Sequence, residues 1–178
     1  MGRVAAIVLA AGEASRFGAP KQRLLLPSVL ERLSAAPVDE IVVVAGAHPL
    51  DVPSNSLLQG PAIRLVECDD WDRGAGASLR CGLAALGEDV EAAVVVLADG
   101  PNLAAPAVER VLRAWRESGG VVAAAAYGGD RGHPLVLGRS DWTGIPDEGL
   151  RDLPVRLVPC DDLGAPGDVD TPADLPEL

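Results

Sequence analysis

The stretch that decides the fold is "VAAIVLAAGEASRFGAPK", residues 4–21. It opens with an apolar run without alternation, which is typical of a strand buried on both faces of a sheet. The residues that follow contain two glycines, Arg16 and Lys21, and few other large side chains. Glycines let a backbone approach a ligand and basic side chains attract anions, so the pattern predicts a phosphate-binding loop. A surface turn with two solvated cations is the alternative that these residues leave open.

Further apolar runs repeat the strand signature at residues 40–46, 62–68, 92–98 and 121–127. Helical patterns fall between them: a capping box at Ser28-Val-Leu-Glu31 opens one helix, and others are expected over 77–87 and 105–120. Alternating strands and helices predict an α/β fold, with a mostly parallel sheet and helices on both faces. The segment 128–178 is rich in Pro, Gly and Asp and is expected to wrap the site.

Length and charge limit the function classes. A chain of 178 residues is expected to form one domain over 1–178. It has 26 acidic and 15 basic residues, a net charge of −11, which argues against a nucleic-acid or anionic-membrane partner because both need a basic face. Arg3 and the apolar run after it mimic a short signal peptide, but a buried first strand explains the same letters.

The cysteines bear on the compartment. Cys68, Cys81 and Cys160 are odd in number and show no C-x-x-C spacing. This pattern favours reduced thiols in the cytoplasm over a disulfide framework. No stretch approaches the length of an apolar membrane span.

Acidic residues follow two of the apolar or extended segments. In open α/β sheets ligands bind at the carboxyl ends of the strands. Asp99 ends "LAD" directly after a buried strand, where a carboxylate can hold Mg²⁺ together with the phosphates of a nucleotide. Asp168 and Asp170 in "GDVDTPADL" share one face if the segment is extended. Helix capping is the alternative role for Asp99 and Asp170.

A second glycine-rich stretch is "WDRGAGASLRCGL", residues 71–83. It predicts a turn feeding a helix N-terminus, with Ser78 facing an anion or a base, although Ser78 as a plain cap remains open. Arg80 stands where a nucleophile elbow requires glycine. His48 and His133 are the only histidines, which weighs against a Ser-His-Asp hydrolase, and a lone His133 is typical of a turn or core position.

These motifs together resemble a known family. "LAAGEASRFGAPK" (9–21) resembles L-A-A-G-x-S-x-R-[MF]-G-x-x-K of the MobA-like NTP transferases, and is most similar to their molybdopterin cytidylyltransferase branch. The resemblance continues in order, nearly from end to end, through "GAGASLRCGL", "LADGPNL", "GGDRGHPLVLGR", "DEGLRD" and "DVDTPADL".

The resemblance implies a Rossmann-like, doubly wound domain similar to the nucleotide-diphospho-sugar transferases. It implies transfer of CMP from CTP to the phosphate of molybdopterin, with Mg²⁺ as cofactor and release of pyrophosphate. Carried over by position, the nucleotide would contact Leu9, Ala10, Ala11, Gly12, Arg16, Lys21, Gly76 and Ser78. The catalytic residues would be Arg16, Lys21 and Asp99, the metal ligands Asp99, Asp170 and Asp168, and the acceptor-binding residues His133 and Arg151.

Other functions stay open at this stage. A related nucleotidyltransferase that uses GTP or another phosphorylated acceptor is one alternative, since the guanylyl branch has glycine where Ala11 stands. A catalytically weakened protein that carries molybdenum cofactor to a partner molybdoenzyme is a second alternative. It arises because "KQRLLLPSVLERL" runs from Lys21 into a helix without the family's usual strand and G-[RK]-P-L-L turn. A NAD-linked dehydrogenase would need G-x-G-x-x-G, which is missing.

Overall fold

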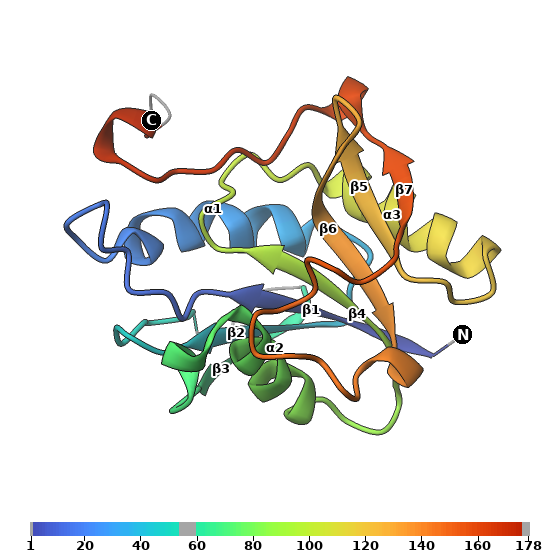
Figure 1. Ribbon diagram of the computed structural model, residues 1–178, viewed down its shortest axis with the longest axis horizontal. Coiled ribbons are helices and arrows are strands. Elements are labelled where there is room, and N and C mark those ends of the chain that lie inside the picture. Colours follow the sequence, from blue (N-terminus) through green and yellow to red (C-terminus); the bar gives the residue numbers. More distant parts are fainter. Residues whose placement is uncertain (1, 54–59, 176–178) are drawn as a thin grey trace.

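The computed structural model describes residues 2–53 and 60–175. A seven-stranded sheet has the order β3-β2-β1-β4-β6-β5-β7 (Figure 1). Its strands are β1 (Arg3–Leu9), β2 (Glu40–Ala45), β3 (Ala62–Glu67), β4 (Val90–Leu97), β5 (Ala123–Tyr127), β6 (Asp130–Gly138) and β7 (Arg156–Pro159). Neighbouring pairs are parallel except where β6 lies antiparallel between β4 and β5. The predicted α/β fold with a mostly parallel sheet is confirmed.

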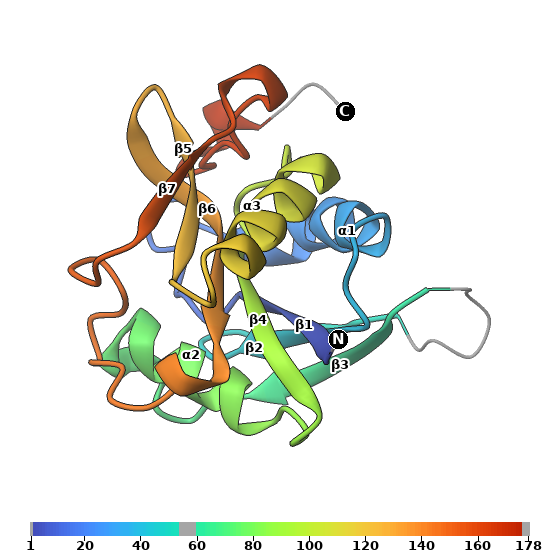
Figure 2. The same ribbon diagram turned by 90° about the vertical axis from the view of Figure 1, so that its right-hand side faces the viewer.

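Helices cover both faces of the sheet (Figure 2). α1 (Lys21–Ser34) and α3 (Ala105–Glu117) pack on one face, and α2 (Ala75–Ala84) packs on the other. β1 alternates between the two layers: Val8 joins the layer of α1 and α3, whereas Ile7 joins that of α2. Among residues 2–53 and 60–175, no helix is long and apolar enough to cross a membrane.

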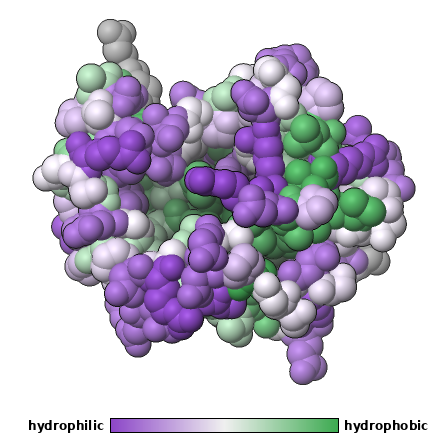
Figure 3. All heavy atoms as spheres, viewed as in Figure 1, coloured by the Kyte–Doolittle hydropathy of each residue, from purple (hydrophilic) through white to green (hydrophobic). Residues whose placement is uncertain are grey.

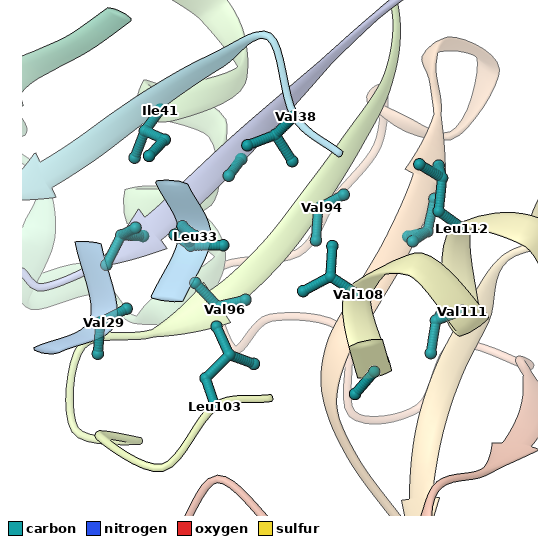
Figure 4. Packing of buried hydrophobic residues seen from close by; sticks show 14 of the residues in the cluster. Val29, Leu33, Val38, Ile41, Val94, Val96, Leu103, Val108, Val111 and Leu112 are labelled. Carbon is teal, nitrogen blue, oxygen red and sulfur yellow. The ribbon is translucent and has the colours of Figure 1, made fainter. Parts of the chain in front are cut away.

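The larger core layer explains why α1 and α3 form where they do. Val29 and Leu33 lie four residues apart on α1, and Val108 lies on the buried face of α3. Each helix therefore presents one apolar stripe to the sheet. Figure 4 shows Leu33 beside Val96 of β4 and Val108 beside Val94, and Val29 belongs to the same buried cluster. These contacts hold the second half of α1, and α3, against β4, and both α1 and β4 border the candidate site.

The start of α1 corrects one prediction. The helix begins at Lys21, not at the proposed capping box, and Ser28 lies inside it with Pro27. The reason is tertiary packing, because Leu25 and Leu26 are buried and extend the apolar stripe N-terminally of Pro27. A proline costs the helix one internal hydrogen bond, and the buried leucines offset that loss. Lys21 therefore stands at the first position of a helix.

The C-terminal third is more ordered than the sequence predicted. Residues 128–178 were expected to wrap the site, yet they contribute β6 to the interior of the sheet and β7 to its edge. The sequence analysis did not predict β6 because its sequence, "DRGHPLVLG", contains glycine, proline and only a short apolar run. Residues 165–170 do run past the ends of the strands: Asn102 N donates to Pro166 O and Val169 N to Asp99 O.

The thiol prediction is wrong for two of the three cysteines. Cys68, directly after β3, and Cys81, inside α2, form a disulfide with Cα atoms 5.9 Å apart. Cys160 is free and buried. The pairing arises because the chain turns back between β3 and α2, so residues 13 apart in sequence become neighbours. A spacing of this length carries no disulfide signature of its own.

We predict that Cys81→Ser lowers the free energy of unfolding by about 3 kcal/mol under oxidising conditions, because a closed loop of this size restricts the unfolded chain. Urea unfolding with and without dithiothreitol checks this. In reductant the variant and the wild type should be about equally stable. A wild-type stability that reductant leaves unchanged would contradict the prediction.

Candidate functional site

A cleft of about 280 Å³ opens at the carboxyl ends of β1 and β4. The loop between β1 and α1 forms one wall, and the turn after β4 forms the other. Figure 3 shows this face of the molecule hollowed near its centre, with hydrophilic side chains around the hollow. The cleft is lined by Leu9, Gly12, Ala14, Ser15, Arg16, Phe17, Lys21, Gln22, Leu97, Ala98, Asp99 and Asp170. It thus unites the first loop with Asp99 and Asp170, as the strand-end rule predicted.

Lys21 is the centre of this cleft. Its side chain is buried at 9% exposure, and its Nζ lies 3.1 Å from Asp99 Oδ2 and 3.5 Å from Asp170 Oδ1. It also donates to the carbonyl of Val169. Arg16 reaches Asp170 from the exposed side, with its Nη1 2.8 Å from Asp170 Oδ2. Neither aspartate caps a helix, because the N-caps of α3 and of the last short turn are Ala104 and Thr171.

The first loop is held by both apolar and polar contacts. Phe17 packs with Leu25 of α1 and with Val169, which ties the loop to the segment that carries Asp170. The loop reverses at Ala14 and Gly18, which both have positive φ angles. Gln22 Nε2 donates to Gly12 O over 2.9 Å. The loop that holds Arg16 is therefore braced against the helix that holds Lys21.

The carboxylates have the chemistry of a divalent-cation site. Asp99 and Asp170 converge on one ammonium, and carboxylate oxygens are the donors that a hard cation prefers. Burial, with the charges of Asp99 and Asp170, raises the pKa of Asp168, so this edge holds excess negative charge. Among the residues described, no three acidic, His or Cys side chains form a ready metal site. A cation there would need further ligands, such as phosphate oxygens.

Ala10 and Ala11 lie beside the cleft rather than on its surface. Both are buried, Ala10 N donates to Val44 O, and Ala11 O accepts from Ala47 N. A Cβ built on Gly46 would meet the Ala11 methyl at 2.8 Å, so this methyl packs tightly under the turn after β2. That turn lines a second cleft, of about 290 Å³, with Trp71 and Asp69.

The structure does not bring Gly76 and Ser78 into either cleft. The segment after Ile145 covers the start of α2: Gly76 N donates to Asp147 O over 2.8 Å, and a Cβ on Gly76 would collide with Pro146 O. Ser78 is buried at 4% exposure. The cover is held by charge, since the Asp147 carboxylate pairs with both Arg73 and Arg80. The absence of a side chain at Gly76 thus allows these two segments to pack closely.

A third pocket, of about 440 Å³, adjoins the first and shares Leu97 with it. His133 lines it with Arg131 of β6 and Asp168. Arg151 is exposed and lines a separate hollow made by residues 141–154. Its carbonyl oxygen accepts a bond from Arg131. The structure thus places His133 beside the cleft and Arg151 apart from it, while Arg131 and Gln22 are lining residues that the sequence analysis missed.

A larger hollow, of about 720 Å³, lies between α1 and residues 50–53 and 60–63. It is lined mainly by apolar side chains such as Leu26, Leu30 and Ile63. Its cation, Arg23, already donates to the carbonyl of Pro49. We assign no phosphate chemistry to it.

The sequence profile of the MobA-like NTP transferase domain matches residues 6–153. The chain belongs to the MobA-like NTP transferase family. It is a nucleotidyltransferase. The paired basic and acidic side chains of the cleft, such as Lys21 with Asp99, are in keeping with this activity. No curated protein matches the sequence.

Solved structures resemble this MobA-like protein over nearly their whole length. Rv0371c from Mycobacterium tuberculosis H37Rv is 26% identical over 97% of this chain and 95% of its own, with a TM-score of 0.75. The manganese complex of Rv0371C from the same organism is 24% identical over 99% and 94%, with a TM-score of 0.69. CMP:2-keto-3-deoxy-manno-octonic acid synthetase complexed with CTP is 15% identical over 96% and 94%, at 0.68. The last two show the fold alone, which is that of the nucleotide-diphospho-sugar transferases.

The pocket beside β6 makes the stability of this MobA-like protein pH-dependent. Burial lowers the pKa of His133 to about 4 from 6.5, Arg131 acts in the same direction, and Asp99 opposes it. Because the folded state resists protonation, the unfolded state binds the proton first, and stability falls as the pH drops from about 6.5 to about 4.

We predict that His133→Gln loses less stability than the wild type between pH 7 and pH 4.5, by about 1–3 kcal/mol. Urea unfolding at the two pH values measures the difference. An identical acid loss in both proteins would contradict the prediction.

Proposed function

We propose that this nucleotidyltransferase transfers CMP from CTP to the terminal phosphate of molybdopterin and releases pyrophosphate. The observation that supports it most is the buried ammonium of Lys21 between Asp99 and Asp170, in the cleft that adjoins the pocket of His133. The family match supports nucleotidyl transfer, and a neighbour of the same fold was solved with CTP. The acceptor belongs to the proposal alone.

The reaction needs positioning and charge rather than a protein nucleophile. An oxygen of the acceptor phosphate bonds to the α-phosphorus of CTP while the bond from that phosphorus to the bridging oxygen breaks, and pyrophosphate leaves with the electron pair. Arg16 and Lys21 are the cations of the first loop and of the start of α1, and they would stabilise the charge that grows on the leaving group. This accounts for a cleft without His or Cys among its lining residues.

Mg²⁺ fits the donor set as a cofactor. Asp99 and Asp170, with Asp168 near them, would hold it, and it would supply charge neutralisation of the phosphates. The manganese in the complex of Rv0371C is a divalent metal on the same fold. Asp99 and Asp170 now share the charge of Lys21, so binding of phosphates by Lys21 would free their oxygens for the cation.

In this proposal the parts of the two substrates lie in three neighbouring hollows. The triphosphate lies along the first loop, and the base lies toward the cleft of Trp71 and Gly46, beyond Ala11. The phosphopterin enters the pocket of His133, whose imidazole is neutral at pH 7 and whose neighbour Arg131 has no carboxylate partner among the described side chains.

Pyrophosphate release in Mg²⁺, with each NTP and with and without molybdopterin, tests the proposal. Asp99→Asn should lower the rate by about a hundredfold or more, because it removes a charge from the cation site. Asp162→Asn is the matched control, since Asp162 pairs with Arg110 on the exposed side of α3. Near-native rates in Asp99→Asn would contradict the metal role, and release only with another acceptor would contradict the molybdopterin assignment.

Base choice gives a separate prediction. The wild type should prefer CTP over GTP by roughly tenfold to a hundredfold in kcat/KM, since the buried methyl of Ala11 supports the Gly46 turn from below, and that turn would leave less room for the larger purine. Ala11→Gly should narrow that ratio in competition kinetics without reversing it. Gly46→Ala adds a methyl that would lie 2.5 Å from Trp71 Cβ and 2.8 Å from the Ala11 methyl, so it crowds the cleft further and should not relax the preference. Equal use of both nucleotides, or a preference for GTP, by the wild type would overturn the cytidylyl assignment.

A further inference from the structure

Gln22 carries a polar group that packing alone does not explain. It is the second residue of α1, and its side chain is 5% exposed. Its Nε2 donates to Gly12 O over 2.9 Å. Its Oε1 is shielded from solvent and has no hydrogen-bond partner within residues 2–53 and 60–175. A buried acceptor without a donor costs stability, so such a group calls for a functional reason.

The orientation of this amide is fixed by chemistry. The Gly12 carbonyl is an acceptor only, so the NH₂ of the side chain must face it, and rotation of the amide would set two oxygens against each other. The unpaired atom is therefore the oxygen. A methionine has about the same length without a polar oxygen, and it would fill the site without this cost.

Gly12 is the residue that this bond controls. It is exposed, and a Cβ built on it would touch only Gln22 Nε2, at 3.7 Å, so packing does not hold its peptide. Glycine also rotates more freely than other residues. Without Gln22, the Gly12 carbonyl is free to turn its negative end toward the cleft, where it would repel phosphate oxygens.

We propose that Gln22 is a positioning residue for the nucleotide: it holds the Gly12 carbonyl away from the triphosphate and fixes the first loop to the helix that begins with Lys21. Arg16 on the loop and Lys21 on the helix then keep one spacing before the nucleotide arrives. The inference rests on the proposed placement of the triphosphate in this cleft. It assigns to Gln22 no contact with the reacting atoms.

Gln22→Met separates this role from a structural one. The exposed Gly12 carbonyl can bind water instead, and the unpaired oxygen disappears, so the melting temperature should stay equal or rise. The affinity for NTP, measured by calorimetry with CTP and GTP, should nevertheless fall by about tenfold or more. KM for the acceptor should change little. A stable protein that binds NTP poorly is the expected signature.

Gln22→Glu adds a pH readout. Its carboxylate has the shape of the amide but cannot donate to Gly12 O, so nucleotide affinity should fall further than in Gln22→Met at pH 8. Protonation restores a donor, so the affinity relative to the wild type should recover as the pH falls toward 5. Arg23→Met is the matched control: the next residue of α1 loses a bond to the Pro49 carbonyl, outside this cleft, and should bind NTP normally.

Each outcome decides the proposal. A folded Gln22→Met protein that binds NTP as the wild type does would overturn it, whatever its melting temperature, and a lower melting temperature in that case would show a structural role. Normal NTP binding by Gln22→Glu at pH 8 would overturn it as well. A wild type that binds NTP but uses no molybdopterin refutes the proposed acceptor and leaves the Gln22 arms decisive. A wild type that binds no NTP refutes both.

Discussion

The ammonium of Lys21 is the interaction on which the site depends. It joins three parts of the chain that are distant in sequence: the start of α1, the end of β4 at Asp99, and the C-terminal segment at Asp170. Burial of a charge is costly, and here it is offset by two carboxylates and the Val169 carbonyl. Such a group adds little net stability compared with an apolar core residue. Its value lies in the geometry that it imposes on the cleft.

The sheet topology explains why the cleft and the pocket of His133 meet. β4 lies between β1 and β6, so the turn after β4 borders the first loop on one side and β6 on the other. β6 runs antiparallel to β4, and this brings its first residues, among them Arg131 and His133, to the edge where β1 and β4 end. A parallel strand in that place would bring its last residues there instead. The antiparallel strand β6 therefore completes the pocket of His133.

The sequence predicted those parts that follow from local pattern. The buried strands are apolar without alternation, and the residues after β1 and β4 fall at one edge by the rule for parallel sheets, so Arg16, Lys21 and Asp99 could be placed together. The rest depends on contacts between distant segments. Gly76 and Ser78 looked like a ligand turn, but the segment around Asp147 covers them through Arg73 and Arg80. The unpaired oxygen of Gln22, like the pairing of Cys68 with Cys81, leaves no trace in residue spacing.

The ion pairs of the cleft determine how the proposed substrate and a cation would bind. Arg16 and Lys21 are the cations of the cleft, and both are already paired with aspartates, so an entering triphosphate must compete for them. Each bond that it takes from Lys21 or Arg16 leaves a carboxylate of Asp99 or Asp170 without its partner. An unpaired carboxylate at this partly buried edge is unfavourable, and burial, together with the charges of Asp99 and Asp170, already raises the pKa of Asp168 there. In the proposed reaction the triphosphate and a divalent cation would therefore favour each other's binding: the anion would take the basic side chains, and the cation would replace them at the acidic ones.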